Sequence, residues 1–591
     1  MPVDTIVSRL FQQASTRPDA PALFTKQRGA WRAISYRSYA HTVRELARAL
    51  LALGFTTGDT VSILGFNRPE WAYAAVGAMA AGGAAAGIYT TSSASEIRYI
   101  AGHAESKVLV VEDATLLERV LSIADELPAL QKIVTMLPCD SRDPRVIGFD
   151  AFLATGKAVD TERLDQRIAS LEPGGLASLI YTSGTTGPPK GVMLSHDNLA
   201  FTASLAQELA GAGASDCSLS YLPLSHIAEQ MFTIHGSITM GGSVYFAESL
   251  EKVPENLKEV QPTLFFGVPR IWEKFHAKVS GGIANAKGPK RRLVEWARRV
   301  GLRVSQLRMK GREPVGLLAL EYKAAKRLVF DKLKPAMGLG RARFCVSGAA
   351  PIAKEVLEFF ASLDVVILEV YGQSEDCGPT SCNLVGRTKL GTVGPPAAGV
   401  TVKIADDGEI LVRGRNVFLG YMKDPEATRE VLVDGWLHSG DLGALDEDGF
   451  LTITGRKKDI LITAGGKNIA PKNLEADLKN HPLVSEAVVI GDRRKYLTAL
   501  VTLDPEALEA FGRTHGLGPA ELHQHPSVRA SIQATVDEIN KDLARVETIK
   551  RFTILSRALS IESGELTPTL KVKRKVVSEH FASEIEAMYA E

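Results

Sequence analysis

The run from Tyr181 to Gly191 carries the residue types that a polyphosphate requires. Its eleven residues include four aliphatic hydroxyls, three glycines and Lys190, and they directly follow the apolar stretch Leu176–Ile180. This pattern predicts a buried strand that runs into a loop with exposed backbone amides. Glycine lets the main chain approach a ligand closely, and the lysine adds positive charge. We therefore predict that this loop binds phosphate.

The spacing within this run differs from that of the common phosphate-binding loop. There the lysine directly follows the second glycine, and Ser or Thr comes next. Here two prolines separate Gly187 from Lys190, and Gly191 follows the lysine. Because proline fixes φ and lacks an N–H group, we expect a stiff loop that does not simply open a helix. A plain turn is the alternative for such a composition; the lysine and the preceding strand favour phosphate binding.

The size and composition of the chain limit its class. A chain of 591 residues is longer than one that usually folds around a single hydrophobic core, so two or three domains are expected. Apolar residues at 45% and charged residues at 23% are typical of a soluble globular protein. A net charge of +1 gives no overall attraction to nucleic acid or to an anionic membrane. Five scattered cysteines without metal spacing favour a reducing, cytoplasmic location, and the N-terminal residues do not resemble a signal peptide.

Helix and strand patterns alternate along the chain, which predicts an α/β fold. The expected helices are His41–Leu53 and Asp197–Leu209, and the expected strands are Val61–Leu64, Lys107–Val111, Lys132–Met136 and Ser243–Phe246. The longest apolar stretch, Trp71–Ile88, is mostly alanine and includes four glycines. We interpret this stretch as a tightly packed helix of a soluble core rather than a membrane span.

Two later segments have distinct patterns. Between Lys287 and Lys334 there are fifteen Lys or Arg and four Asp or Glu, with apolar residues at helical intervals. The helical positions are Leu293, Trp296, Val300, Val304 and Leu307. This predicts a basic amphipathic helix, which is either a solvated face or a surface that meets anionic lipid headgroups or an acidic partner.

The C-terminal third indicates a domain boundary. Gly408–Gly414 and Phe450–Thr454 alternate as antiparallel strands do, and the charged run Gly455–Asp459 then suits an exposed hinge. Beyond it we expect a second, smaller sheet of Ile460–Thr463, Val484–Ile490 and Thr498–Leu503, covered by helices such as Pro471–Lys479 and Val528–Leu543. The predicted domains are therefore residues 1–457 and 458–591.

Six short blocks follow one another over almost 400 residues. They are Tyr181–Gly191, Gly348–Pro351, Tyr371–Glu375, Trp436–Asp441, Gly455–Asp459 and Thr567–Lys571. Each is weak alone, but together and in this order they make the chain resemble the adenylate-forming superfamily of acyl-CoA synthetases, luciferases and nonribosomal adenylation domains. Leu222–Glu229, Gly267–Glu273 and the basic segment further resemble long-chain fatty acyl-CoA synthetases, especially the bubblegum-like branch.

The resemblance implies a fold and a reaction. The fold is α/β, with a large N-terminal adenylate-forming domain of α/β sheets plus a small β-barrel-like part, and a small α+β C-terminal domain that rotates about a hinge. In the reaction a fatty acid carboxylate attacks the α-phosphate of ATP and gives an acyl-adenylate and pyrophosphate. The thiol of CoA then displaces AMP. Because the nucleophile is weak and its target is anionic, the protein must supply positive charge and orientation.

The resemblance also assigns residues to the nucleotide. Those implied to bind ATP and AMP are Thr182, Ser183, Gly184, Thr185, Thr186, Gly187, Lys190, Gly348, Ala349, Ala350, Tyr371, Gly372, Gln373, Ser374, Asp441 and Arg456. Tyr371 would stack on adenine, and Asp441 would accept from the ribose hydroxyls with help from Arg456. Glu375 would help to bind Mg²⁺, a hard ion that prefers oxygen ligands. A surface acid at Glu375 and a structural Asp441–Arg456 ion pair are the alternatives.

Four further roles follow from the resemblance. Lys571 would be the adenylation lysine, although Thr569-Leu570 replace the more common small residues before it and leave Lys573 as a competitor. Lys458 would be the hinge residue, and rotation about it would present Gly465 and Gly466 to CoA. His226 would lie near the acyl-adenylate; the alternative is a satisfied core histidine.

Other functions remain as alternatives. An acyl-AMP ligase would transfer the acyl group to an acyl carrier protein, and a CoA ligase could act on another carboxylic acid. A binding protein without catalytic activity would require loss of Lys571, Glu375 or Asp441, and all three are present. A hydrolase is disfavoured because the sequence around Ser374 lacks the second glycine of a nucleophile elbow. No nucleic acid partner is expected.

Overall fold

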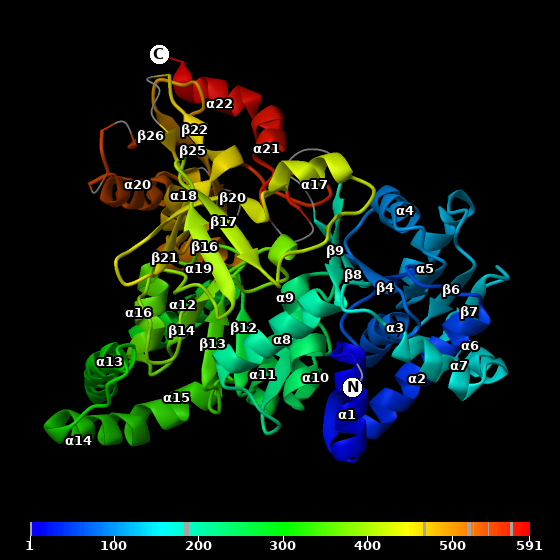
Figure 1. The fold of residues 1–591 in the computed structure, drawn as a ribbon. Coiled ribbons are helices and arrows are strands. Elements are labelled where there is room, and N and C mark those ends of the chain that lie inside the picture. The colour runs from blue at the N-terminus through cyan, green and yellow to red at the C-terminus, as the bar shows by residue number, and fades with distance from the viewer. Residues whose placement is uncertain are drawn as a thin grey trace.

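The computed structural model describes residues 3–182, 188–464, 468–516, 522–523, 525–541, 543–545, 547–567 and 571–590. Figure 1 shows the orange and red C-terminal segment packed at one end of a larger N-terminal part. The helices of the N-terminal part begin with α1 (Ile6–Thr16), α2 (Tyr36–Ala52), α3 (Pro69–Ala80), α4 (Ala94–His103), α5 (Ala114–Leu121), α6 (Phe149–Thr155), α7 (Thr161–Ala169) and α8 (His196–Ala210). They continue with α9 (Ile227–Gln230), α10 (Gly236–Met240), α11 (Val253–Val260), α12 (Pro269–Ala284), α13 (Gly288–Arg308), α14 (Gly316–Ala325), α15 (Asp331–Ala336), α16 (Lys354–Ser362) and α17 (Pro425–Val431).

An eight-stranded, mostly parallel sheet carries the predicted phosphate loop. In sheet order its strands are β18 (Gly420–Tyr421), β9 (Lys190–Ser195), β8 (Leu176–Thr182), β4 (Ala84–Ile88), β3 (Thr60–Leu64), β5 (Val108–Val111), β6 (Lys132–Thr135) and β7 (Val146–Gly148). β8 and β9 form an antiparallel pair, so the chain continues after the loop as a strand. The expectation that this loop does not open a helix is confirmed.

Two four-stranded sheets complete the α/β portion. One has the order β10 (Cys217–Ser220), β11 (Ser243–Phe246), β1 (Pro21–Gln27) and β2 (Ala30–Ser35). The other has the order β12 (Leu264–Gly267), β13 (Phe344–Ser347), β14 (Ile367–Tyr371) and β15 (Ser381–Cys382). β12, β13 and β14 are parallel and wholly or largely buried, so their carboxyl ends lie along one edge of the sheet. This edge carries Gly348 and Gly372.

The small β part is a five-stranded antiparallel sheet. It pairs β16 (Val400–Ile404), β17 (Glu409–Gly414), β20 (Trp436–Leu445) and β19 (Leu432–Val433) in that order, with β21 (Leu451–Arg456) also on β20. The two predicted strands correspond to β17 and β21. The strand β20 lies between them and was not predicted; it contains the Trp436–Asp441 block.

One prediction for the core is wrong in part. Trp71–Ile88 is a helix only up to Ala80, and its last five residues form the buried strand β4. The break falls at Gly82, whose φ of +91° is left-handed, and at Gly83, where a Cβ would lie 2.1 Å from the Asp59 carbonyl oxygen. A continuous apolar run cannot distinguish a buried helix from a buried strand, because neither has a polar face.

The C-terminal sheet also differs from the prediction. β24 (Val484–Ile490) and β25 (Leu497–Leu503) pair as expected, but the third strand is β26 (Ile549–Ile554), which was not predicted. β22 (Leu461–Ile462) pairs instead with β23 (Asn468–Ile469) in a separate two-stranded sheet. The helices here are α18 (Pro471–Lys479), α19 (Pro505–His515), α20 (Pro526–Lys541), α21 (Arg574–His580) and α22 (Ala582–Tyr589).

The hydrophobic core divides in the same way as the sheets. Two buried clusters consist only of residues from Leu461 onward, whereas the others consist of residues before it. Within the described ranges, no helix is long and apolar enough to cross a membrane.

Candidate active site

The β8–β9 hairpin positions the two ends of the phosphate loop. Thr182 and Lys190 are opposite each other in the antiparallel register. Ser183, Gly184, Thr185, Thr186 and Gly187 lie outside the described residues. The Lys190 ammonium lies 4.8 Å from the centre of the Tyr421 ring and 3.9 Å from the Asp424 carboxylate. A cavity of about 150 Å³ adjoins this lysine, with Tyr99, His103, Pro188, Pro189, Met422 and Asp424 in its wall.

Tyr421 connects the lysine with Glu375. Its hydroxyl donates to Glu375 Oε1 at 2.8 Å, while its ring lies beneath Lys190. Tyr421 is on β18, which pairs with β9, so the strand that follows the loop also holds this tyrosine. Tyr421 was not predicted from the sequence. The residues around Tyr421 give no local signal of these contacts, because Glu375 is 46 residues away in the sequence and Lys190 is still farther.

The residues predicted to bind adenine and ribose lie on three strands. Tyr371 at the end of β14 donates from its hydroxyl to Asp441 Oδ2 at 3.0 Å. Asp441 and Arg456 are cross-strand partners on β20 and β21, and Arg456 Nε lies 3.5 Å from Asp441 Oδ1. The structure therefore brings together three predicted residues. The Asp441–Arg456 ion pair is present, and the Asp441 carboxylate also accepts from Tyr371.

Backbone constraints fix the segments that would border adenine. A Cβ at Gly372 would lie 1.4 Å from the Gly378 carbonyl oxygen, so no other residue fits there. At Gly348 a Cβ would lie 2.7 Å from Val370 Cγ1. Ala349 has a left-handed φ of +69°, an uncommon conformation for a residue with a side chain. Ala349 and Ala350 are exposed, whereas Gly348 is buried. Gly348 and Gly372 are thus closely packed, and Ala349 has a strained backbone conformation of the kind that is frequent at ligand sites.

A buried carboxyl organises the turn after Gly372. Asp376 accepts from the backbone N–H of Gln373 at 2.7 Å and from the hydroxyl of Thr380 at 2.5 Å. Burial raises the pKa of Asp376 to about 8. Ser374 is buried in this turn, and the side-chain nitrogen of Gln373 is buried with no hydrogen-bond partner in the described part of the chain. The turn directs Glu375 toward Tyr421.

Lys571 comes from the other end of the sequence and lies near Arg456, Asp441 and Glu375. We call the region that these four residues border the cleft. Partial removal from bulk water lowers the pKa of the Lys571 ammonium to about 8, and the charges of Arg456 and Lys472 act in the same direction. Asp441 and Glu375 act in the opposite direction. Lys571 is nevertheless an exposed residue by its solvent-accessible area. The C-terminal segment is therefore docked with Lys571 among the predicted nucleotide residues.

The local fold distinguishes Lys571 from Lys573. The N–H of Thr567 donates to the Lys571 carbonyl at 2.8 Å, and the N–H of Lys571 donates to Thr567 Oγ1 at 3.0 Å. Lys573 donates its N–H to Glu565 instead and stands at the start of α21. It is Lys571 whose charge interacts with Asp441 and Glu375.

His226 lies at the start of α9, within range of Lys571. Its Nδ1 accepts from the backbone N–H of Ala228 at 3.2 Å. Burial lowers the pKa of His226 to about 4, and the positive charge of Lys571 contributes. The imidazole is therefore neutral at pH 7. The preceding residue, Ser225, packs so closely on β4 that a Cβ at Gly87 would lie 2.6 Å from Ser225 Cα.

A buried polar cluster holds the turn that carries His226. Glu229 Oε1 accepts from the hydroxyls of Ser220 and Thr233, each at 2.7 Å. Asn67 donates to the carbonyl of Leu222 at 2.7 Å, which fixes the turn to the end of β3. Burial raises the pKa of Glu229 to about 7. The motif Leu222–Glu229 was singled out from the sequence, but this supporting role of its glutamate was not.

The predicted hinge lies between two anchored neighbours. Lys457 pairs with Asp407 at 2.6 Å and with Glu409 at 3.0 Å, both in the N-terminal part. Asp459 pairs with Lys472 at the start of α18, at 3.4 Å. Lys458 is exposed and makes no ion pair within the described ranges. Gly465 and Gly466 lie outside the described residues.

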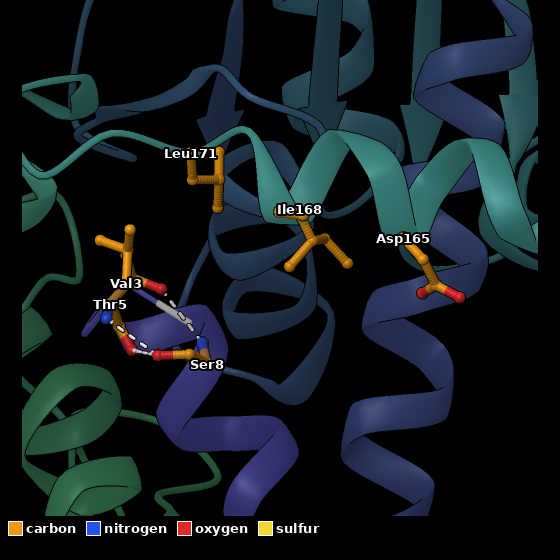
Figure 2. Close-up of a pocket in the computed structure, with 7 residues that line it drawn as sticks. Val3, Thr5, Ser8, Asp165, Ile168 and Leu171 are labelled. Carbon is orange, nitrogen blue, oxygen red and sulfur yellow. Dashed lines mark hydrogen bonds between the residues drawn. The ribbon is translucent and has the colours of Figure 1, made fainter. Parts of the chain in front are cut away.

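A second cavity has different properties. It measures about 340 Å³ and lies between α1 and α7, where Figure 2 shows Val3, Thr5 and Ser8 facing Asp165, Ile168 and Leu171. Thr5 and Ser8 form a capping box, in which the hydroxyl of each residue accepts from the backbone N–H of the other. Asp165 pairs with Arg44 at 2.6 Å. Because its polar groups are already paired, this cavity offers little to a ligand.

Comparison with known proteins identifies the family. Residues 10–422 match the AMP-binding enzyme family, and residues 458–591 match the C-terminal domain of AMP-binding enzymes. The first match covers more than half of the chain.

The chain belongs to the AMP-binding enzyme family.

Named relatives agree with this assignment, and solved structures share the fold. The chain is 39% identical to the long-chain-fatty-acid–CoA ligase ACSBG2 of Xenopus laevis, over 99% of this chain and 83% of that protein. It is 37% identical to the long-chain-fatty-acid–CoA ligase FadD15 of Mycobacterium tuberculosis, over 99% and 97%. The fold resembles the anthranilate CoA ligase AuaEII bound to anthranoyl-AMP, with a TM-score of 0.72, 23% identity and coverage of 98% and 97%. It also resembles ATP-bound MatB of Rhodopseudomonas palustris, with a TM-score of 0.71, 24% identity and coverage of 98% and 99%.

For this AMP-binding enzyme we predict that Tyr371→Phe weakens AMP binding. The substitution removes the hydroxyl that holds Asp441. A lost hydrogen bond of about 0.5–1.5 kcal/mol would raise the Kd roughly 2- to 12-fold. Isothermal titration calorimetry with AMP measures this change. Tyr496→Phe, which removes a hydroxyl bonded to the Met588 carbonyl, is the control. An equal Kd in wild type and Tyr371→Phe would contradict the prediction.

We also predict that His226 stays neutral in the folded protein down to about pH 5. Its folded pKa of about 4 lies below the ordinary value of 6.5, so the unfolded chain takes up a proton first as the pH falls. Stability is therefore lost between about pH 6.5 and pH 4, with a slope of at most about 1.4 kcal/mol per pH unit for this group. His226→Gln should reduce the slope of unfolding free energy against pH in this window, and His515→Gln, at an exposed position, is the control. An NMR titration in which His226 has a pKa near 6.5 would disprove the prediction.

Proposed function

We propose that this protein is an ATP-dependent long-chain fatty acid–CoA ligase. It converts a fatty acid and ATP into acyl-AMP and pyrophosphate, and then exchanges AMP for CoA to give acyl-CoA. The observation that carries this proposal is the convergence of Lys571, Asp441, Arg456 and Glu375 in one cleft. The identities of 37–39% to proteins named long-chain-fatty-acid–CoA ligase support the choice of substrate class.

In the proposed adenylation step the protein orients the anions and provides charge. The loop Thr182–Lys190 would hold the β- and γ-phosphates, and Asp441 would accept hydrogen bonds from the ribose hydroxyls. Lys571 would stabilise the charge that develops at the α-phosphate. An amine with a pKa near 8 is mostly protonated at pH 7, and bound phosphates would favour its charged form further.

The residues present fit a Mg²⁺ ion held jointly with the nucleotide. The described residues contain no cluster of three or more side chains that could bind a metal by themselves. One carboxylate, Glu375, borders the cleft on the same side as Lys190, with Tyr421 between them. Mg²⁺ commonly takes one or two protein carboxylates and completes its shell with phosphate and water. When bound, the ion would offset the negative charge of the phosphates.

A partly exposed apolar surface beside Gly348 suits an acyl chain. The Phe232 ring stacks on Phe266 at 5.1 Å, and Ala228 and Val370 pack on the same cluster. His226 caps α9 and Phe232 lies six residues later on the same helical stretch, so the neutral imidazole would face the reacting carboxyl group while the chain extends over the apolar side chains. This arrangement supports a hydrocarbon substrate over a polar acid.

We propose that residues 1–457 and 458–591 are two domains that change their relative orientation between the half-reactions. The separate core clusters and the anchored neighbours of Lys458 support a rotation there. Rotation would withdraw Lys571 and present Gly465 and Gly466 to CoA. We also propose a cytoplasmic enzyme that contacts membranes peripherally through residues 287–334.

A panel of carboxylic acids tests the substrate and the acceptor. With ATP and Mg²⁺, pyrophosphate release is measured with and without CoA, and the products are identified by mass spectrometry. We expect thioesters of long-chain fatty acids. Acyl-AMP that forms but is transferred only to an acyl carrier protein would favour the carrier-linked alternative, and a preference for short or aromatic acids would refute the long-chain assignment.

Two substitutions should separate the half-reactions. Lys571→Ala is expected to reduce adenylation by at least about 100-fold, since it removes charge aimed at the α-phosphate, yet to convert supplied acyl-AMP to thioester. Lys458→Pro is expected to do the reverse, because a fixed φ restricts the hinge. Pyrophosphate release and thioester formation from supplied acyl-AMP measure the two steps.

Lys573→Ala is the matched control, with the same loss of charge two residues away. Equal defects in both steps for Lys571→Ala would indicate a structural role. A larger adenylation defect in Lys573→Ala would transfer the proposed role to that lysine.

A further inference from the structure

The helix α14 has apolar residues on two opposite sides. Leu318, Tyr322, Ala325 and Val329 pack on α13 in one buried cluster. On the other side Leu317, Leu320 and Ala324 follow one another at helical intervals i, i+3 and i+7. A surface helix of a globular protein normally turns its apolar side toward the core and exposes a polar side. Here only one of the two sides is covered by the described part of the chain.

The uncovered side is strongly exposed. Leu317 is 73% exposed and Leu320 is 63% exposed, while Val315, just before the helix, reaches 81%. Leu328, in the π-helical turn that follows, is 48% exposed. We call these four residues the α14 apolar patch. Figure 1 shows α14 at the lower-left edge of the molecule, on the outer side of α13 and α15. An exposed group of large aliphatic side chains indicates a contact surface.

Unpaired positive charges accompany this patch. Within residues 287–334, nine exposed Lys or Arg side chains make no ion pair with any described residue. They are Lys287, Lys290, Arg292, Arg299, Lys310, Arg312, Lys323, Arg327 and Lys332. Lys323 and Arg327 are on the same helical stretch as the patch, and Lys310 and Arg312 directly precede it. The chain as a whole has a net charge of only +1, so the positive charge is local.

We propose that the α14 apolar patch and its surrounding Lys and Arg residues form a docking surface for an anionic phospholipid bilayer. Aliphatic side chains would enter the boundary between headgroups and acyl chains, and the cations would contact the phosphates. An acidic protein would match the charge, but charge complementarity alone does not account for four exposed aliphatic side chains beside the cations. This surface extends the proposed membrane contact of the basic segment, and its binding does not require the ligase activity.

Vesicle flotation tests this surface with the full-length chain and no substrate. We expect binding to vesicles of phosphatidylcholine and phosphatidylglycerol in a 7:3 ratio, and much weaker binding to pure phosphatidylcholine. Leu317→Gln/Leu320→Gln should weaken binding at least about tenfold, since apolar burial at the interface is lost. Lys323→Gln/Arg327→Gln should weaken it roughly 25-fold at low salt, from about fivefold for each charge.

Matched controls use exposed positions elsewhere. Leu250→Gln changes a leucine that is 58% exposed after β11, and Lys157→Gln/Arg163→Gln changes two exposed cations near α7, on the opposite side of the molecule in Figure 1. Both should bind vesicles as wild type does. Circular dichroism and melting temperature confirm folding of each variant.

Three results would overturn the docking surface. The first is that the wild-type protein does not bind the anionic vesicles. The second is that Leu317→Gln/Leu320→Gln binds them as tightly as wild type does. The third is that the protein binds polyglutamate instead of vesicles, and that this binding depends on the same residues. Thioester formation from a fatty acid delivered on albumin should be equal in all variants. If the wild-type protein forms no thioester in this assay, the ligase assignment is refuted, whereas the conclusion from the vesicle experiment still holds.

Discussion

The cleft depends on bringing the ammonium of Lys571 next to Asp441, Glu375 and Arg456. These residues lie 115 or more positions from the lysine, so only docking of the C-terminal segment assembles them. The lysine is moderately destabilised there, since its pKa falls to about 8. An anion bound beside Lys571 would offset both the burial of the ammonium and its repulsion by Arg456 and Lys472. In the proposed reaction, a bound polyphosphate would stabilise the docked position of Lys571, and departure of pyrophosphate would remove that stabilisation.

Close backbone packing and hydrogen bonds constrain the conformation of the residues that border the cleft. Gly372 touches the backbone at Gly378, and Ala349 accepts a left-handed φ. Tyr371 donates a hydrogen bond to Asp441 and Tyr421 donates one to Glu375, and each bond restricts the orientation of the carboxylate. Such preorganisation reduces the reorganisation needed when charge develops in a reaction. In the proposed rotation, the motion between half-reactions would be concentrated at Lys458, between the anchored Lys457 and Asp459.

The proposed membrane surface and the cleft differ in how precisely their side chains must be positioned. The cleft needs fixed geometry, so its side chains are paired or packed. The α14 apolar patch needs only exposed aliphatic groups and unpaired cations, because a bilayer adapts its shape to the protein. A substrate that partitions into lipid would give such a surface a role in supply, since the enzyme would be held near its dissolved acid.

The amino-acid sequence determined the elements whose signals are local. The strand before the phosphate loop, the order of the six blocks, the helix α18 and the strands β11 and β24 could all be predicted, because periodicity and spacing are properties of a few neighbouring residues. Lys571, Asp441, Arg456 and Glu375 were selected in the same way. Only the tertiary structure decided that these four share a cleft, that Tyr421 joins Lys190 to Glu375, and that Trp71–Ile88 divides into a helix and a strand. It also decided which side of α14 stays uncovered. Each of these depends on contacts between distant parts of the chain, which local patterns do not encode.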